Sequence, residues 1–259
     1  MTTSLRDAVY GLAVGDALGV PYEFRPRGSF ECAGMVGHGT HGQPAGTFSD
    51  DTSMTLATCD SIRARGRIDV ADMRRRFEDW ISRGAYAVDG AVFDYGNTTA
   101  RALRTGRGCA GECDNGNGSL MRIAPLAFTD ATDDEVRAAS AITHAHALSC
   151  DVCVRYVRLL REIAAGARPD ALAAYEGADA SGIASGGYVA DTYGAALWCL
   201  ANTSDYAGCV LAAVNLGDDT DTTAAVAGAL AGAMYGFDSI PSEWLETLRG
   251  RDIIEACLF

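Results

Sequence analysis

Two short acidic segments contain the residues of this chain whose types and spacing could support chemistry. Each segment combines paired carboxylates with hydroxyl groups and precedes a run with helical spacing. Neighbouring carboxylates repel one another and raise each other's pKa, so such clusters favour a hard divalent cation bound through oxygen atoms. Two helix N-termini facing one site would supply ligands for two Mg²⁺ or Mn²⁺ ions. The candidate ligands are Ser49, Asp50, Asp51, Asp219, Asp221 and Thr222.

A simpler interpretation of either segment remains open. Asp, Ser and Thr are common N-cap residues, and a helix N-terminus favours negative charge. Either acidic turn could therefore be a solvated surface feature. The segment 216–223 nevertheless holds three carboxylates, more than capping needs, and a second acidic segment lies far upstream at 48–54. The pair therefore favours a metal site more than either segment alone.

The elements that must position these residues are predicted to be helices. Apolar residues recur at helical spacing in segments 4–18, 52–65, 71–83 and 189–202, and the stretch 134–165 is typical of two helices. Glycine recurs every fourth residue from Gly11 to Gly19, which predicts close approach of another backbone there. The same spacing from Gly228 to Gly236 would line one helix face. Few aromatic residues (8%) and abundant glycine favour packed helices over a sheet. The fold class that follows is all-α.

Charge and cysteine content exclude several classes of function. A formal net charge of −13 argues against broad nucleic-acid or anionic-membrane binding, because those surfaces require Lys and Arg. The chain has nine cysteines, an odd number, and most of them lie in apolar segments with helical spacing. Both features favour a cytoplasmic chain whose cysteines are reduced. A zinc site at Cys109, Cys113, Cys150 and Cys153 is a weaker alternative, because no cysteine-rich knuckle surrounds either pair. No segment predicts a leader peptide or a membrane span.

Seven blocks of the sequence resemble the ADP-ribosylglycohydrolases, a family that includes the dinitrogenase reductase-activating glycohydrolases. The blocks follow the family's order over nearly the whole chain and include both acidic segments. They are 11–19 with Glu23, 49–52, 94–99, 115–122, 143–146, 187–192 and 217–222.

The resemblance implies a fold, an activity and partners. The fold would be one domain over residues 1–259, a compact orthogonal helical bundle of this family's type with a central dinuclear metal cleft. The activity would be release of ADP-ribose from a modified side chain, with the arginine N-glycosidic linkage foremost. The partners would be an ADP-ribosylated protein or another ADP-ribosyl conjugate, with ADP-ribose as product, and the chain would act as a monomer.

The resemblance also assigns roles to residues outside the acidic segments. Glu23 would lie beside the metals, and Asp94 would lie close to the scissile bond as general acid or base. The Gly- and Pro-rich loop 25–47 would be a mobile cover over the site, and we expect its two histidines, His38 and His41, to be simply exposed.

The remaining expected contacts are with the ADP-ribosyl group. The turn-rich segment 114–119 could cradle a pyrophosphate through backbone N–H groups, aided by the N-terminus of a following helix. The ring of Tyr188 would stack on the adenine, although it could also be packed in the core. One of His144 and His146 would face the cleft, because two histidines at i and i+2 cannot share a helical face. The expected binding residues are Asn97, Thr98, Asn117, Gly118, Ser119, His144 and Tyr188.

One departure from the family's last motif concerns Asp218, where the family usually has Gly. We expect Asp218 to be an extra acid at the helix entrance, directed to solvent or lying behind the metal ligands. Two other functions also remain open. Asp-rich two-metal sites serve phosphoesterases and nucleotide hydrolases, and the same fold could bind ADP-ribose without catalysis.

Overall fold

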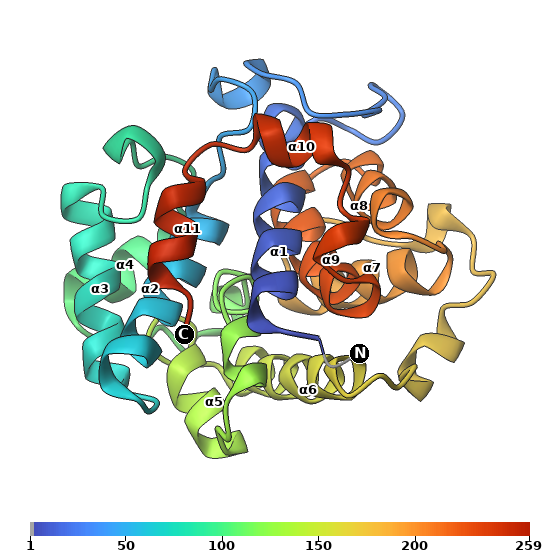
Figure 1. The fold of residues 1–259 in the computed structure, drawn as a ribbon. Coiled ribbons are helices and arrows are strands. Elements are labelled where there is room, and N and C mark those ends of the chain that lie inside the picture. Colours follow the sequence, from blue (N-terminus) through green and yellow to red (C-terminus); the bar gives the residue numbers. More distant parts are fainter. Residues whose placement is uncertain (1–2) are drawn as a thin grey trace.

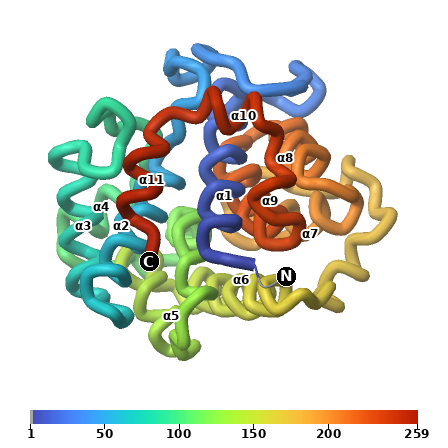
Figure 2. The backbone as a smooth tube through the Cα atoms, in the orientation of Figure 1, coloured from blue at the N-terminus to red at the C-terminus, as the bar shows by residue number. Residues whose placement is uncertain are grey.

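The computed structural model describes residues 3–259, and this part of the chain folds into α-helices and short 3-10 helices without β-strands. Figure 1 shows the elements as a ribbon and Figure 2 traces the same path as a tube. The all-α prediction is confirmed. The α-helices are α1 (Leu5–Gly19), α2 (Asp50–Arg65), α3 (Val70–Arg83), α4 (Asn97–Thr105), α5 (Asp133–Ser140), α6 (Ala147–Ala164), α7 (Val189–Ala201), α8 (Tyr206–Asn215), α9 (Thr220–Tyr235), α10 (Ser242–Thr247) and α11 (Arg251–Cys257). The 3-10 helices are η1 (Val20–Tyr22), η2 (Gly39–His41), η3 (Val88–Gly90), η4 (Glu112–Asp114), η5 (Ala124–Phe128), η6 (Asp170–Ala174), η7 (Ala180–Gly182) and η8 (Phe237–Ser239).

The two glycine-rich helices, α1 and α9, pack against each other through their backbones. A Cβ atom on Gly11 would collide with the carbonyl oxygen of Gly228, and one on Gly15 would collide with that of Ala224. The close approach predicted from the glycine spacing in α1 is therefore confirmed. Gly236 does not belong to this face, because α9 ends at Tyr235 and Gly236 follows it with φ 85°. The expectation for that third glycine was wrong, because a residue of positive φ ends the helix.

The other helices surround this central pair. In Figure 1, α7 and α8 lie on the side of α9, whereas α2, α3 and α4 lie on the opposite side of α1. Helix α11 packs on α2, and α6 runs crosswise to α1 along one edge of the view. The arrangement brings the N-terminal ends of α2 and α9, which are far apart in the sequence, into one region beside α1.

Buried tyrosines tie the central pair to its neighbours. The hydroxyl of Tyr206 on α8 donates to the carbonyl oxygen of Gly11 at 2.7 Å, and that of Tyr156 on α6 donates to Val226 at 2.9 Å. Both side chains are fully buried, so each polar hydroxyl requires such a partner. These bonds anchor the middle of α1 and of α9 to the neighbouring helices α8 and α6.

The segment after residue 119 differs from the sequence expectation. Residues 118–122 form turns, and η5 is a short 3-10 helix. A helix beginning at residue 120 would place Pro125 in its interior, where the ring and the missing N–H disrupt an α-helix, whereas Pro125 is tolerated at the start of η5. In residues 3–259, no helix combines the length and apolar character that crossing a bilayer requires.

Candidate metal centre and active-site cavity

A cavity of about 340 Å³ lies where the N-terminal ends of α2, α4 and α9 approach one another. Its walls come from seven separate segments, and the N-terminal end of α4 forms one side. Most of the lining side chains carry oxygen or nitrogen atoms, so the cavity suits a polar ligand. The lining residues are Glu23, Phe24, Asp50, Asp94, Tyr95, Gly96, Asn97, Thr98, Thr99, Gly116, Asn117, Gly118, Met121, His144, Gly187, Asp219 and Thr222.

The structure brings the two acidic segments together at the floor of this cavity. Asp51 Oδ2 accepts hydrogen bonds from Ser49 Oγ of its own segment and from Thr222 Oγ1 of the other, each at 3.3 Å. Asp50, Asp219 and Thr222 line the cavity, whereas the other three candidate ligands are buried directly behind them. Helix N-termini that are 170 residues apart in the sequence therefore meet through their side chains.

Asp16 of α1 positions the first acidic segment, a role that sequence analysis missed. Its carboxylate is fully buried and accepts hydrogen bonds from the backbone N–H of Ser49 at 2.9 Å and of Thr52 at 3.0 Å. The hydroxyl of Thr52 donates to the same carboxylate at 2.6 Å. Asp16 thus binds the free N–H groups at the start of α2. An acid within the apolar stretch 12–18 was the sequence signal for it.

The carboxylates of the floor are strongly perturbed. Burial, followed by the charges of neighbouring acids, raises the pKa of Asp50, Asp51 and Asp221 well above the usual range. Burial also raises the pKa of Asp219, and that of Glu23 to about 8. Such a cluster cannot be fully ionised without a compensating positive charge.

Three carboxylate oxygens of this cluster lack any hydrogen-bond donor among the described residues. They are Asp51 Oδ1, Asp219 Oδ1 and Asp221 Oδ2. A buried acceptor without a partner is costly, and cations are the partners that carboxylate oxygens accept when no donor is present. Glu23, Asp219 and Asp221 also place one carboxylate oxygen each within 4.8 Å of one another. The residues therefore fit a hard divalent cation.

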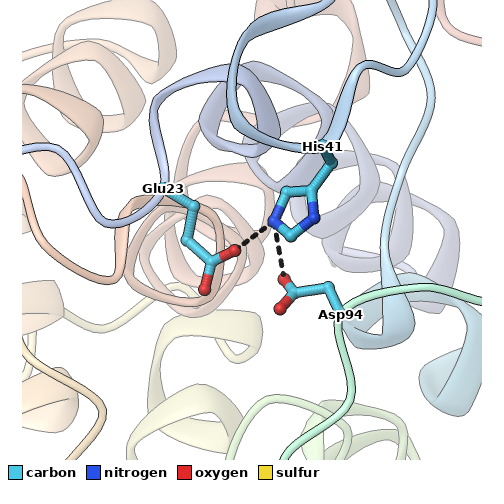
Figure 3. A group of neighbouring side chains, drawn as sticks. All are labelled: Glu23, His41 and Asp94. Atoms are coloured by element: carbon cyan, nitrogen blue, oxygen red, sulfur yellow. Dashed lines mark hydrogen bonds and ion pairs between the residues drawn. The ribbon is translucent and has the colours of Figure 1, made fainter.

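A second group joins the acid that the resemblance places beside the metals to the acid that it places close to the scissile bond. Figure 3 shows Glu23, His41 and Asp94 converging from three segments. His41 Nε2 pairs with Glu23 Oε2 and lies 3.7 Å from Asp94 Oδ2. The hydrogen bond to Glu23 raises the pKa of His41. The imidazole therefore bridges the two carboxyl groups at the edge of the cavity.

The position of His41 corrects the expectation that both loop histidines are simply exposed. The side chain of His41 is only 15% exposed, and its ring lies 5.2 Å from that of Phe93. Only His38 is exposed as expected. Residues 25–47 contribute this contact by folding back to Glu23, where Thr40 Oγ1 donates to the Glu23 carbonyl at 2.7 Å. A loop sequence carries no periodicity from which this contact could have been inferred.

Five of the seven expected binding residues line the cavity. They come from the start of α4, the segment 115–118 and the turn before α6, and they are Asn97, Thr98, Asn117, Gly118 and His144. Asn117 links this side to the metal ligands, because its Nδ2 donates to Asp219 Oδ2 at 2.8 Å and to Thr192 Oγ1 at 2.9 Å. His144 is 2% exposed yet lines the cavity, whereas His146 caps α6 through the N–H of Leu148.

Ser119 does not line the cavity. Its side chain is fully buried and accepts a hydrogen bond from Ser140 Oγ at 2.9 Å, and it lies 3.5 Å from Cys153 Sγ. The helix N-terminus expected after this residue is also absent, because residues 118–122 form turns. The expectation that a following helix supports this loop was wrong. The helix end that faces the cavity is instead that of α4, which begins at Asn97.

Aromatic rings lie at the cavity and beside it. Tyr188 is 45% exposed and does not line the cavity, but it follows Gly187, which does. Its backbone is bridged to Gly116 on the cavity wall. Phe24 and Tyr95 line the cavity and are also exposed, and sequence analysis assigned neither a role.

Asp218 is exposed and adopts φ 60°, a left-handed conformation that favours glycine. Its backbone pairs with the segment that carries Glu23: Phe24 N donates to Asp218 O at 2.7 Å, and Asp218 N donates to Arg25 O at 2.9 Å. The family's glycine at this position thus has a conformational explanation.

The all-α fold and the carboxylate-lined cavity define a class of helical proteins whose oxygen-rich site fits a divalent cation, and comparison with known proteins gives the family. The sequence model described as ADP-ribosylglycohydrolase matches residues 2–258. The chain belongs to the ADP-ribosylglycohydrolase family and is a glycosidic-bond hydrolase.

Individual relatives are similar over nearly the whole chain. ADP-ribosylarginine hydrolase Tri1 of Pseudomonas putida (strain GB-1) is 36% identical over 93% of this chain and 73% of its own length. ADP-ribosyl-[dinitrogen reductase] glycohydrolase of Rhodospirillum rubrum is 34% identical over 93% of this chain and 88% of its own. A solved structure named ADP-ribosylglycohydrolase-related protein complex has a TM-score of 0.82 at 36% identity and covers 96% of this chain and 93% of its own.

Proposed function

We propose that this hydrolase releases ADP-ribose from ADP-ribosylated arginine side chains of proteins and uses two divalent ions, Mg²⁺ or Mn²⁺. The observation that carries the proposal is the meeting of two acidic helix N-termini at one cavity, with three carboxylate oxygens that have no donor among the described residues. The linkage follows the similarity to a relative named as an ADP-ribosylarginine hydrolase.

The proposed metal ligands are the six residues of the two segments. Thr222 and Asp50 would hold an ion from the cavity side, and the buried Asp51 would reach it from behind. When bound, the ions would polarise oxygen atoms and lower the pKa of water. The remaining proposed ligands are Ser49, Asp219 and Asp221.

The chain's own acids would move the protons. Asp94 lines the cavity with 17% of its side chain exposed, so it could exchange a proton with the leaving guanidine nitrogen or with water. Glu23 lines the same cavity, and burial raises its pKa to about 8 in the metal-free protein, so it could take part in this proton transfer. We assign the catalytic roles to these two residues.

The opposite wall would bind the ADP-ribosyl group. The N-terminal end of α4 faces the cavity with its unpaired backbone N–H groups, and such ends favour anions. Asn97, Thr98, Asn117, Gly118 and His144 add donors on the same wall, which would let an acidic chain hold a diphosphate locally. Tyr188 would contact the adenine from beside Gly187, and Ser119 would act indirectly by supporting the loop.

We also propose that residues 1–259 act as one domain and as a monomer, because one chain supplies every wall of the cavity. A cytoplasmic location agrees with the free cysteines, which a reducing compartment maintains.

The test is incubation of the protein with separately prepared arginine-, serine- and nucleobase-linked ADP-ribose conjugates, with and without chelator, while free ADP-ribose is followed. We expect release from the arginine conjugate, loss of release with chelator, and recovery with Mg²⁺ or Mn²⁺. Formation of AMP or phosphate would instead indicate a phosphoesterase, and tight binding without turnover of any conjugate would indicate a binding protein. Full activity in a metal-free preparation would contradict the proposed metal site.

A further inference from the structure

Arg122 is a buried cation whose role the proposed chemistry does not explain. Its side chain is fully buried, and its guanidinium carbon lies 4.4 Å from the centre of the Phe77 ring. Nε and one terminal nitrogen have no hydrogen-bond partner among residues 3–259, and no carboxylate in this part of the chain pairs with Arg122. Burying a charge with so few hydrogen-bond partners lowers the stability of the folded protein, so Arg122 is expected to serve another role.

The other terminal nitrogen of Arg122 begins a chain of hydrogen bonds that ends at the cavity. It donates to the hydroxyl of Thr143 at 2.9 Å and to the carbonyl oxygen of Ala139 at 3.2 Å. The same Thr143 hydroxyl lies 2.9 Å from Nδ1 of His144. Thr143 and His144 are both buried, and His144 lines the cavity.

The hydrogen-bonding capacity of these groups determines the direction of each bond. A guanidinium can only donate, so the Thr143 hydroxyl accepts from Arg122. The hydroxyl has one hydrogen of its own, and His144 Nδ1 is its only acceptor among the described residues. If Nδ1 carried a proton, that buried hydroxyl hydrogen would have no acceptor, which costs about 1–3 kcal/mol. The favoured arrangement therefore has Nδ1 as the acceptor.

We infer that Arg122 and Thr143 are positioning residues that fix His144 as the tautomer with its proton on Nε2, so that this N–H donates to an oxygen of the ligand. The edge of the His144 ring that carries Nε2 faces Gly116 and Gly118 in the cavity wall. A Cβ atom added to either glycine would lie 3.4 Å from Nε2. Among residues 3–259, Nε2 has no hydrogen-bond partner.

The same groups keep the imidazole neutral. Burial and, to a smaller extent, the charge of Arg122 lower the pKa of His144 to about 3. Burial lowers the pKa of Arg122 only to about 10, so the guanidinium stays charged near neutral pH. His144 thus presents a neutral donor of fixed orientation. The identity of the accepting ligand as ADP-ribose rests on the proposed function, whereas the tautomer does not.

The test uses the full chain labelled with ¹⁵N-histidine. The sequence contains four histidines, and the spectrum of His144→Gln assigns the relevant pair of ring nitrogens. In the wild-type protein without ligand, at pH 7, we expect a pyridine-like Nδ1 and a protonated Nε2. Thr143→Val removes the hydroxyl at nearly constant volume, and the ratio of Nδ1–H to Nε2–H imidazole should rise roughly fivefold or more. Thr143→Ser should restore the wild-type spectrum.

Thr58→Val is the matched control. Thr58 is also buried, and its hydroxyl donates to a helix carbonyl, that of Met54, at 2.9 Å. This variant removes a buried hydroxyl in the same way and should leave the His144 spectrum unchanged. We expect Thr143→Val, and not Thr58→Val, to weaken ADP-ribose binding by roughly threefold to tenfold.

A wild-type His144 protonated on Nδ1, or a Thr143→Val spectrum identical to that of the wild type, would overturn the inference. If the spectra agree with the inference but the wild-type protein does not bind ADP-ribose, the proposed function fails while the positioning roles stand.

Discussion

Two adjacent acids, Asp218 and Asp219, should respond in opposite ways to substitution. Asp219 lines the cavity, and its Oδ1 has no donor among the described residues, whereas Asp218 is exposed. Asp219→Ala should therefore abolish metal binding. Asp218→Gly should preserve it.

The expected size of the metal-induced stabilisation follows from the linkage between metal binding and folding. A metal present at 100 times its dissociation constant stabilises the folded protein by about 2.7 kcal/mol. For a chain of this length that corresponds to an increase in Tm of roughly 5–10 °C. If Asp219→Ala raises the dissociation constant to the metal concentration or above, the stabilisation falls below about 0.4 kcal/mol, or roughly 1–2 °C. Without metal the variant should still fold, because Asn117 keeps its bond to Thr192.

For Asp218→Gly two effects oppose each other. Glycine removes the strain of the left-handed conformation at φ 60°, but it also increases the entropy of the unfolded chain. The net change in unfolding free energy should stay within about 1 kcal/mol. The metal-induced rise in Tm should remain.

The assay is a pair of melting curves for each variant, with and without Mg²⁺ or Mn²⁺. A metal-induced shift that persists in Asp219→Ala and disappears in Asp218→Gly would refute the reasoning. The assignments of Asp221 and Thr222 would then fail as well, since they depend on the same register.

Three further predictions concern catalysis, binding and pH. Asp94→Asn should lower turnover by about 10²-fold or more and leave the metal-induced shift in Tm unchanged, and the exposed Asp238→Asn should have the wild-type rate. Tyr188→Ala should weaken ADP-ribose binding by about 1–3 kcal/mol in calorimetry, whereas an unchanged affinity would exclude a stacked adenine. In the metal-free protein burial raises the pKa of Glu23 to about 8, so the folded state holds a proton that the unfolded state releases. This stabilisation is complete at low pH and is lost as pH rises through about 8, so the Tm should fall between pH 6.5 and 8, and Glu23→Gln should flatten that decline. A rising Tm would contradict the raised pKa.

The parts of the fold that follow from local patterns were predictable. The four-residue glycine repeat of α1 predicted a close backbone contact, because only glycine permits it, and the structure places α9 there. Helical spacing predicted α2, α3 and α7 within two residues of their observed bounds. Both acidic segments could be recognised because each combines paired carboxylates with hydroxyl groups at the start of a run with helical spacing.

Other parts depend on contacts between distant segments. The bond of His41 to Glu23 arises from the path of a loop with no periodic pattern. The burial of Ser119 depends on α5 and α6, which close over it through Ser140 and Cys153. The apolar stretch around Asp16 marks it as a buried acid, but its partners at the N-terminus of α2 are visible only in the structure. Sequence spacing does not encode these distances.

The central claim is that the two acidic helix N-termini hold two divalent ions in one site. The most direct measurement is anomalous diffraction from crystals of the protein grown with Mn²⁺. Our account predicts two anomalous peaks at the floor of the cavity, with carboxylate oxygens of Asp50 or Asp51 and of Asp219 or Asp221 among the ligands. Peaks confined to one segment, or no peak at the cavity at saturating Mn²⁺, would contradict it.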